Sequence, residues 1–172
     1  MALNLKSFIR EIPDWPRKGV NFKDITPLLQ DAAAFRQAID ELAKPYLNKK
    51  VDLVAAIDAR GFLLATAVAY KLGAGVVLAR KKGKLPWKTI SREYALEYGS
   101  NVIEMHEDAI RPGQKVLMID DVLATGGTME AAIELVKKLG GEIVGVSFLI
   151  ELSFLKGKEK LKGYEVREII VY

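Results

Sequence analysis

The sequence predicts an α/β protein whose central, mostly parallel sheet is covered by helices on both faces. Nearly all-apolar runs of strand length alternate with helical patterns along the chain, an order typical of parallel strands buried between two helical layers. Of the 172 residues, 50% are apolar and 28% charged, as in a folded globular protein. No repeat, linker or break in composition divides the chain, so we expect a single domain over residues 1–172.

The individual elements follow from periodicity and from the residues that begin or end them. Asp31 is expected to cap a helix whose apolar positions recur at helical spacing as far as Pro45. Two further helices are predicted at 62–72, closed by Gly73, and at 128–139, stopped by Gly140-Gly141. Buried strands are predicted at 53–57, 76–79, 116–119, 143–150 and 166–171.

The segment from 81 to 111 fits no buried helix. Its middle alternates in polarity, which predicts a hairpin with strands at 94–98 and 102–105 and a turn at Gly99-Ser100. A short stretch, 80–92, holds the basic residues Arg80, Lys81, Lys82, Lys84, Lys88 and Arg92 with no acid among them. Nucleic acid, a membrane surface or a small polyphosphate would each suit such a cluster. A second cluster, Lys156 to Lys162, is interrupted by Glu159 and is interpreted as a solvated loop.

Composition excludes several classes of chemistry. The chain has no cysteine, which excludes disulfides, thiolate nucleophiles and cysteine-based zinc sites. With His106 as the one histidine, interpreted as a surface or packing residue, any metal must be held by oxygen ligands, which favours magnesium. No apolar stretch approaches the roughly 18–20 residues needed to span a bilayer. The first residues do not resemble a secretory signal, so the cytoplasm is the expected location.

Charged residues follow three of the predicted strands. Asp58, Arg80 and the pair Asp120-Asp121 each stand at the carboxyl end of an apolar run. Parallel α/β sheets bind their ligands at this edge. The pattern therefore predicts that these side chains converge on one site.

The segment from Val116 to Thr128 is the most informative in the chain. Two adjacent carboxylates precede a loop of small and hydroxylated residues, Ala124, Thr125, Gly126, Gly127 and Thr128, at the start of a helix. Close backbone N–H groups, hydroxyls and a helix N-terminus suit a phosphate, and the carboxylates suit ribose hydroxyls. The segment lacks the Gly-Lys-Ser/Thr of a triphosphate-binding loop and the spacing of a dinucleotide fingerprint. We expect a ribose-phosphate site; the alternative is a glycine-rich turn beside two solvated acids.

This segment resembles the signature of the type I phosphoribosyltransferases. The resemblance extends over nearly the whole chain, and further segments match the members of that family that act on adenine. These segments lie, in the expected order, at 16–29, 58–62, 80–86 and 96–99. The resemblance implies the fold of that family, with a small base-binding hood within residues 1–30. It also implies a basic loop and a flexible, hairpin-like lid within residues 81–111.

The resemblance also implies roles for individual residues. Asp120 and Asp121 hold the ribose of phosphoribosyl pyrophosphate, and the loop from Ala124 to Thr128 holds its 5′-phosphate. The pyrophosphate-binding residues are Ala59, Arg60, Arg80, Lys81 and Lys84. The adenine-binding residues are Asn21, Phe22, Lys23 and Val122. Glu97 and Arg60 are the catalytic residues, with Glu97 as proton carrier, and Tyr98 belongs to the lid. Without the resemblance, Phe22 would be interpreted as a core residue and Glu97 as a solvent-facing residue of the hairpin.

Cofactor and partners are implied in the same way. Mg²⁺ is expected to be held mainly by substrate and water, with help from Asp120 and Asp121 and no dedicated protein ligand. A homodimer is expected, because the basic segment often serves a neighbouring subunit in this family; neither nucleic acid nor a membrane is expected as partner. A cis peptide is expected near Ala59-Arg60. Two residues depart from the family pattern, Asp58 in place of a glutamate and Trp87 in place of a small residue.

The predicted activity is the transfer of phosphoribose to adenine, which yields AMP and diphosphate. Two alternatives remain open. One is a phosphoribosyltransferase for another base, such as xanthine or orotate. The other is a non-catalytic regulator that senses phosphoribosyl pyrophosphate and binds nucleic acid, for which the net charge of +4 is the main support.

Overall fold

The computed structural model describes residues 2–95 and 100–172. These residues divide into two compact units, Met1–Glu41 and Leu42–Tyr172. Within the described ranges, no helix is both long and apolar enough to cross a membrane. That the whole chain forms a single domain remains a prediction.

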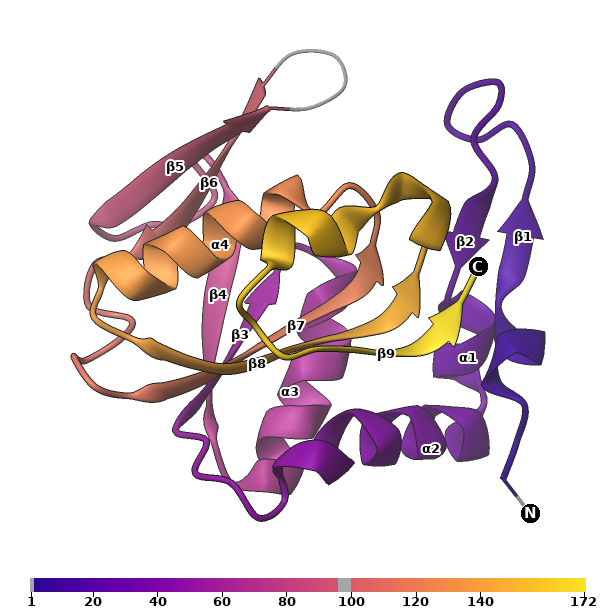
Figure 1. Cartoon of the computed structure of the whole chain (residues 1–172), viewed down its shortest axis with the longest axis horizontal. Helices are drawn as coiled ribbons and strands as arrows, with labels where there is room; N and C mark the ends of the chain where they lie inside the picture. The colour runs from indigo at the N-terminus through magenta and orange to yellow at the C-terminus, as the bar shows by residue number, and fades with distance from the viewer. Residues whose placement is uncertain (1, 96–99) are drawn as a thin grey trace. The chain divides into compact units, whose positions relative to one another are not determined.

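The first unit is built on a two-stranded antiparallel sheet (Figure 1). A 3₁₀ helix η1 (Leu5–Phe8) precedes strand β1 (Arg10–Ile12), which pairs with β2 (Phe22–Asp24). Helix α1 (Thr26–Gln30) follows, and α2 (Ala32–Ala43) begins at the predicted place. The Asp31 carboxylate accepts the N–H groups of Ala33 at 3.0 Å and Ala34 at 2.8 Å, which confirms Asp31 as the N-cap.

The second unit contains a seven-stranded sheet in the order β5-β6-β4-β3-β7-β8-β9. Its strands are β3 (Leu53–Ile57), β4 (Gly75–Lys81), β5 (Thr89–Ala95), β6 (Ser100–His106), β7 (Lys115–Leu123), β8 (Glu142–Glu151) and β9 (Val166–Val171). The five strands from β4 to β9 in this order are parallel, and β5 and β6 add an antiparallel edge. The mostly parallel sheet is therefore confirmed.

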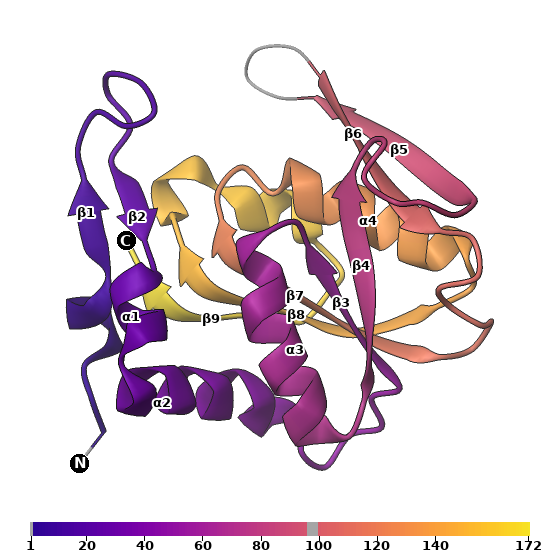
Figure 2. The same ribbon diagram turned by 180° about the vertical axis from the view of Figure 1, so that it is seen from behind.

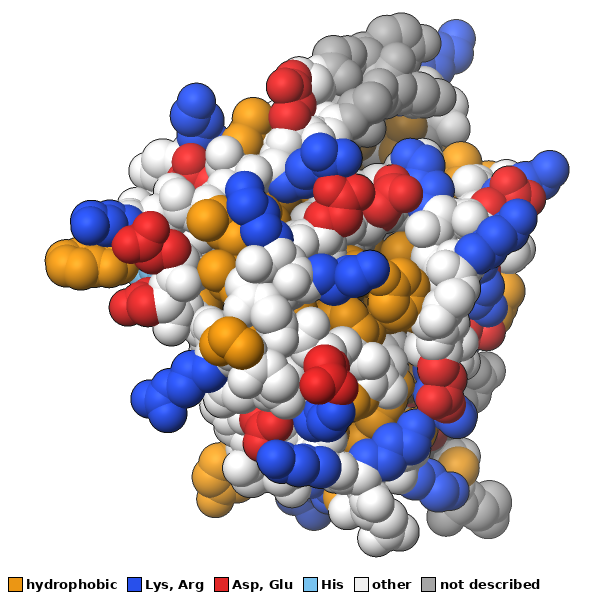
Figure 3. Space-filling view, turned by 60° about the vertical axis from the view of Figure 1, so that its left-hand side comes forward, with side chains coloured by type: hydrophobic (Ala, Val, Ile, Leu, Met, Phe, Trp, Pro, Cys, Tyr) orange, Lys and Arg blue, Asp and Glu red, His pale blue; other side chains and the backbone are white. Residues whose placement is uncertain are grey.

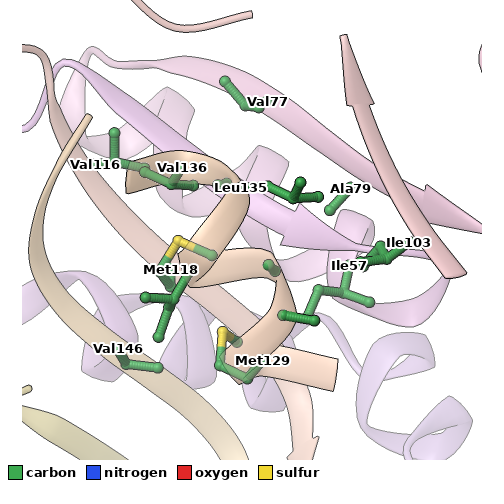
Figure 4. Close-up of a cluster of buried hydrophobic side chains, with 14 of the residues drawn as sticks. Ile57, Val77, Ala79, Ile103, Val116, Met118, Met129, Leu135, Val136 and Val146 are labelled. Atoms are coloured by element: carbon green, nitrogen blue, oxygen red, sulfur yellow. The ribbon is translucent and has the colours of Figure 1, made fainter. Parts of the chain in front are cut away.

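Helices α3 (Arg60–Leu72) and α4 (Gly127–Lys138) lie on opposite faces of this sheet, as Figures 1 and 2 show together. Successive strand residues point to alternate faces. On the α4 face, strand residues such as Ile57, Met118 and Val146 pack with Met129 and Val136 of α4 (Figure 4). The short 3₁₀ helices are η2 (Lys44–Tyr46), η3 (Ser153–Leu155) and η4 (Gly157–Leu161).

Most boundaries agree with the sequence to within two residues, but two differ in ways that matter. Strand β7 was expected to end at Ile119, whereas it continues through both aspartates to Leu123, because pairing with β8 persists as far as Leu123 and Glu151. In the hairpin, the first strand begins at Thr89 rather than at residue 94, and Ser100 lies in β6 rather than in the turn. The cross-strand pairing that starts at Thr89 and His106 decides these boundaries.

Candidate active site

The predicted site residues of the second unit gather at the carboxyl ends of three neighbouring strands. Strand β3 lies between β4 and β7. Asp58 directly follows β3, Arg80 lies near the end of β4, and Asp120 and Asp121 lie near the end of β7. The expected convergence at this edge of the sheet is confirmed.

The two aspartates form a desolvated carboxylate pair. One carboxylate oxygen of Asp120 accepts the backbone N–H of Asp121 at 2.9 Å. Desolvation and the neighbouring Asp121 charge raise the pKa of Asp120 well above its ordinary value. Desolvation also raises the pKa of Asp121, which is only 6% exposed, although the nearby Arg60 guanidinium opposes the rise. Hydroxyl donors or a cation would stabilise the charged form of such carboxylates.

Two residues at the start of α3 hold this pair in place. The Nε of Arg60 lies 2.7 Å from Oδ2 of Asp121; the pair is electrostatic, because that oxygen has no aligned hydrogen-bond donor among the described residues. Gly61 lies so close to β7 that a Cβ there would stand 2.6 Å from Oδ1 of Asp120. Sequence reasoning missed Gly61, because its contact lies 59 positions away in the chain.

The loop after β7 forms a small cavity at the N-terminus of α4. The cavity has a volume of about 70 Å³, several times what one water needs. Gly126 has a left-handed backbone (φ 82°), and no side chain caps α4 among the described residues, so the first N–H groups of the helix are available to an anion. The cavity is lined by Asp120, Val122, Leu123, Ala124, Thr125, Gly126, Thr128, Met129 and Phe148.

The loop is supported from behind by the backbone of Gly157. A Cβ on Gly126 would lie 2.5 Å from the carbonyl oxygen of Gly157, and a Cβ on Gly157 would lie 2.3 Å from that of Ala124. Only glycines permit so close an approach of the two backbones. Gly157 was not predicted as part of the site. The feature of the sequence that could have indicated it is a glycine within a lysine-rich segment.

Asp58 orients the basic side chain at the end of β4. The Nε of Arg80 donates to the Asp58 carboxylate at 3.0 Å, and its Nη1 donates to the Lys84 carbonyl at 3.1 Å. The following turn is fixed by Glu104, which is 7% exposed and accepts the Gly83 N–H at 2.9 Å. The cis peptide bond lies between Asp58 and Ala59, one position earlier than expected.

The remaining pyrophosphate candidates are less constrained. The side chains of Lys81 and Lys84 are exposed at the end of β4 and in the turn that follows. Ala59 is the residue that precedes α3. These positions leave the two lysines accessible to an anionic ligand.

The base-binding candidates of the first unit surround β2. Lys23 donates to the Glu11 carboxylate at 2.7 Å, and Asn21 donates to the same oxygen at 2.6 Å. Both hydrogen bonds lower the pKa of Glu11, and the bond from Lys23 contributes most. The Phe22 ring meets Trp15 edge-on, with ring centroids 4.4 Å apart. Trp15 was not singled out from the sequence.

Glu97 and Tyr98 lie outside the described residues. His106 lies on β6, partly buried, and its Nε2 has no hydrogen-bond partner among the described residues. This placement agrees with a packing residue. Arg92, predicted as part of the basic cluster, instead pairs with Glu134 of α4 at 2.6 Å.

Comparison with known proteins defines the class of this site. Residues 28–171 match the family described as phosphoribosyl transferase domain, and the chain belongs to that family. Within it, the chain is 58% identical over 170 residues to the adenine phosphoribosyltransferase of Thermotoga sp. (strain RQ2), covering 99% of this chain and 100% of the relative. It groups with the adenine phosphoribosyltransferases.

Solved structures agree with this placement. The crystal structure of adenine phosphoribosyltransferase from Thermoanaerobacter pseudethanolicus superposes with a TM-score of 0.95 at 52% identity, over 98% of both chains. The enzyme from Trypanosoma brucei, solved with AMP, pyrophosphate and ribose-5-phosphate, superposes with a TM-score of 0.89 at 25% identity, over 97% of this chain and 78% of that one. The predicted family and fold are thereby confirmed.

Proposed function

We propose that the protein transfers the phosphoribosyl group of 5-phospho-α-D-ribose 1-diphosphate to adenine, forming AMP and diphosphate in adenine salvage. The observation that carries this proposal is the desolvated pair Asp120-Asp121 beside the loop cavity at the N-terminus of α4. The pair supplies acceptors for two ribose hydroxyls, and the cavity supplies donors for a phosphate. The close relatives are adenine phosphoribosyltransferases, which favours adenine as the base.

The loop from Ala124 to Thr128 takes the 5′-phosphate in this proposal. The N–H groups at the start of α4 and the hydroxyls of Thr125 and Thr128 surround the cavity. A phosphate bound here anchors the substrate at a distance from the reacting carbon. Binding energy from this remote group is thereby used to orient the anomeric carbon for attack.

The diphosphate is assigned to the basic residues at the ends of β3 and β4. Arg80, held by Asp58, presents a guanidinium, while Lys81 and Lys84 add exposed ammonium groups. Arg60 and Ala59 complete the set. Arg60 is paired with Asp121, and the substrate would compete with Asp121 for its guanidinium. Positive groups fixed around the leaving diphosphate stabilise the charge that develops as its bond to ribose breaks.

The donor set fits a magnesium ion carried by the substrate. Among residues 2–95 and 100–172, no three His, Asp or Glu side chains gather into a metal-binding group. Mg²⁺ commonly binds through one or two carboxylates together with substrate phosphates, and Asp120 and Asp121 offer such carboxylates. When bound, the ion would neutralise part of the charge on the leaving diphosphate.

Adenine is assigned by resemblance to Asn21, Phe22, Lys23 and Val122. The side chains of Asn21 and Lys23 are engaged by Glu11, so the proposal assigns recognition of the base to backbone groups near Asn21 and to the face of Phe22. Glu97 would accept the proton that adenine loses when it attacks the anomeric carbon. Tyr98 is assigned to the lid that keeps water from the activated sugar.

A homodimer is also proposed, and one apolar surface of the second unit supports it. Leu63 and Tyr70 of α3 are 53% and 90% exposed, and Val76 and Leu78 of the adjacent strand β4 are exposed as well. Helix α3 packs on β4, and exposed apolar side chains on these two neighbouring elements suit contact with a second copy of the chain. Sedimentation of the wild type against Tyr70→Asp should show a dimer in the first and a monomer in the second.

The proposed activity is tested by diphosphate release with phosphoribosyl pyrophosphate, Mg²⁺ and each of adenine, hypoxanthine, guanine, xanthine and orotate. Turnover with adenine alone is the expected result. Turnover with another base would retain the ribose-phosphate site and reject adenine as substrate. Binding of phosphoribosyl pyrophosphate without turnover would favour the regulator. One observation counts against the regulator: basic and acidic side chains intermingle on the face shown in Figure 3, unlike in a nucleic-acid-binding patch.

A further inference from the structure

Lys158 differs from the other lysines of its cluster, which was interpreted from sequence as a solvated loop. Its Nζ lies 2.8 Å from a carboxylate oxygen of Glu151 and 2.8 Å from one of Glu168. The Glu151 side chain is only 7% exposed. Lys158 is therefore held by two ion pairs, although its side chain remains 40% exposed.

Glu151 needs this partner because a buried carboxylate without a counter-charge is strongly unfavourable. Desolvation by itself would lower the pKa of Lys158, but the interactions of its ammonium with the carboxylates of Glu151 and Glu168 outweigh it, and the pKa rises. The lysine therefore stays charged at neutral pH. The charge of Glu151 is compensated by a residue from η4.

The same two residues belong to segments that border the loop from Ala124 to Thr128 (the phosphate loop). Glu151 is in register with Leu123, which lines the loop cavity, and the next residue, Leu152, donates its N–H to the Leu123 carbonyl at 2.9 Å. Gly157, which precedes Lys158, is the backbone that contacts Ala124 and Gly126. The ion pair thus joins the end of β8, which pairs with the strand before the loop, to the segment of Gly157, which contacts the loop.

We propose that Lys158 is a positioning residue of the phosphate site: it neutralises Glu151 behind the loop and holds η4 against it, so that a phosphate dianion can bind in the cavity. An uncompensated Glu151 would repel a group that carries about 1.5 to 2 negative charges at neutral pH. This inference rests on the proposed function only in assigning the 5′-phosphate to the cavity. It adds a residue that does not touch the substrate.

The test is calorimetric binding of ribose 5-phosphate and of inorganic pyrophosphate to full-length variants. Lys158→Met should weaken ribose 5-phosphate binding by at least about tenfold and change pyrophosphate binding less than about twofold. Lys158→Arg, which keeps the charge, should restore ribose 5-phosphate binding to within about threefold of the wild type. Lys162→Met, which removes the same unit of charge from an exposed lysine, should leave both affinities unchanged.

Glu151→Gln tests the electrostatic argument independently, so the argument can be decided even if Lys158→Met is unstable. It removes the buried charge with little change of shape, so ribose 5-phosphate should bind as tightly as in the wild type or more tightly. Weaker binding in Glu151→Gln, or wild-type binding in Lys158→Met, would overturn the inference. A wild type that does not bind ribose 5-phosphate would overturn the proposed function itself, and the inference with it.

Discussion

Replacing Gly157 by alanine should displace the phosphate loop without altering any group that is assigned to contact substrate. Gly157 has no positive φ, so alanine fits the backbone, and the effect is steric. The new Cβ would stand 2.3 Å from the Ala124 carbonyl oxygen and 2.8 Å from Cδ1 of Leu123. Since carbon and oxygen atoms approach to about 3.3 Å at closest, the loop must move by roughly 1 Å.

The size of the effect follows from the cost of overpacking. Extra methyl groups in well-packed sites cost about 1–3 kcal/mol. If loop displacement relieves this strain at the expense of phosphate binding, the affinity for ribose 5-phosphate falls by about 5- to 150-fold, because about 1.4 kcal/mol corresponds to a factor of ten. In steady-state assays the KM for phosphoribosyl pyrophosphate should rise, while the binding of inorganic pyrophosphate should be retained.

Gly145→Ala is the matched control. Its Cβ would stand 2.4 Å from the Tyr46 hydroxyl oxygen, but Gly145 lies opposite Leu117, toward the other end of the strands. Both variants should lose stability, at about 2–4 °C in Tm for each kcal/mol, whereas only Gly157→Ala should lose phosphate affinity. Equal losses of affinity in the two variants, or none in Gly157→Ala, would refute the assignment of Gly157 to the phosphate site.

Four further changes probe other parts of the site. Asp58→Asn removes the charged acceptor of the guanidinium on β4 and should weaken pyrophosphate binding about tenfold with ribose 5-phosphate unaffected; calorimetry with both ligands decides. The pKa of Asp120 is raised in the fold, so its charge opposes folding above that pKa and the cost vanishes as pH falls. Asp120→Asn should therefore raise Tm by a few degrees at pH 7 and by almost nothing near pH 4, while losing ribose 5-phosphate binding; a lower Tm at pH 7 would contradict the sign. In Trp87→Phe, Trp15 is the remaining tryptophan. Adenine should change the fluorescence of Trp15, whereas hypoxanthine should not. An unchanged emission spectrum would contradict the assignment of base binding to the residues near Trp15. Glu97→Gln should lower kcat at least about a hundredfold with little change in substrate binding, and undiminished turnover would exclude it as the proton carrier.

The central strands of the second unit were predictable because each is an apolar run that is mostly buried, as in β3, β7 and β8. Strand β3 was predicted at 53–57 and observed there. The apolar signal failed only where a strand continues into polar residues, as β7 does through Asp120 and Asp121. Hydrogen bonds to the neighbouring strand decide such an end, and they depend on the partner rather than on local composition.

The site was predictable to the extent that it is local in sequence. The acids and the loop that follows them lie within nine consecutive residues, 120–128, so their chemistry could be inferred from one segment. The residues that orient this chemistry come from elsewhere: Asp58 reaches Arg80 across the sheet, and Arg60 reaches Asp121. No spacing rule connects such pairs.

The sequence by itself determined the family, the order of helices and strands from α2 onward, and the segment to which phosphate and ribose chemistry is assigned. Each of these is written in local patterns of polarity or in contiguous motifs. Only the tertiary structure decided which residues elsewhere in the chain position this segment. Gly157 must be bare because another backbone lies 2.3 Å from its absent Cβ, and Lys158 must be charged because a carboxylate is buried beside it. Close packing and desolvation arise between segments distant in the chain, so they have no signature in either segment alone.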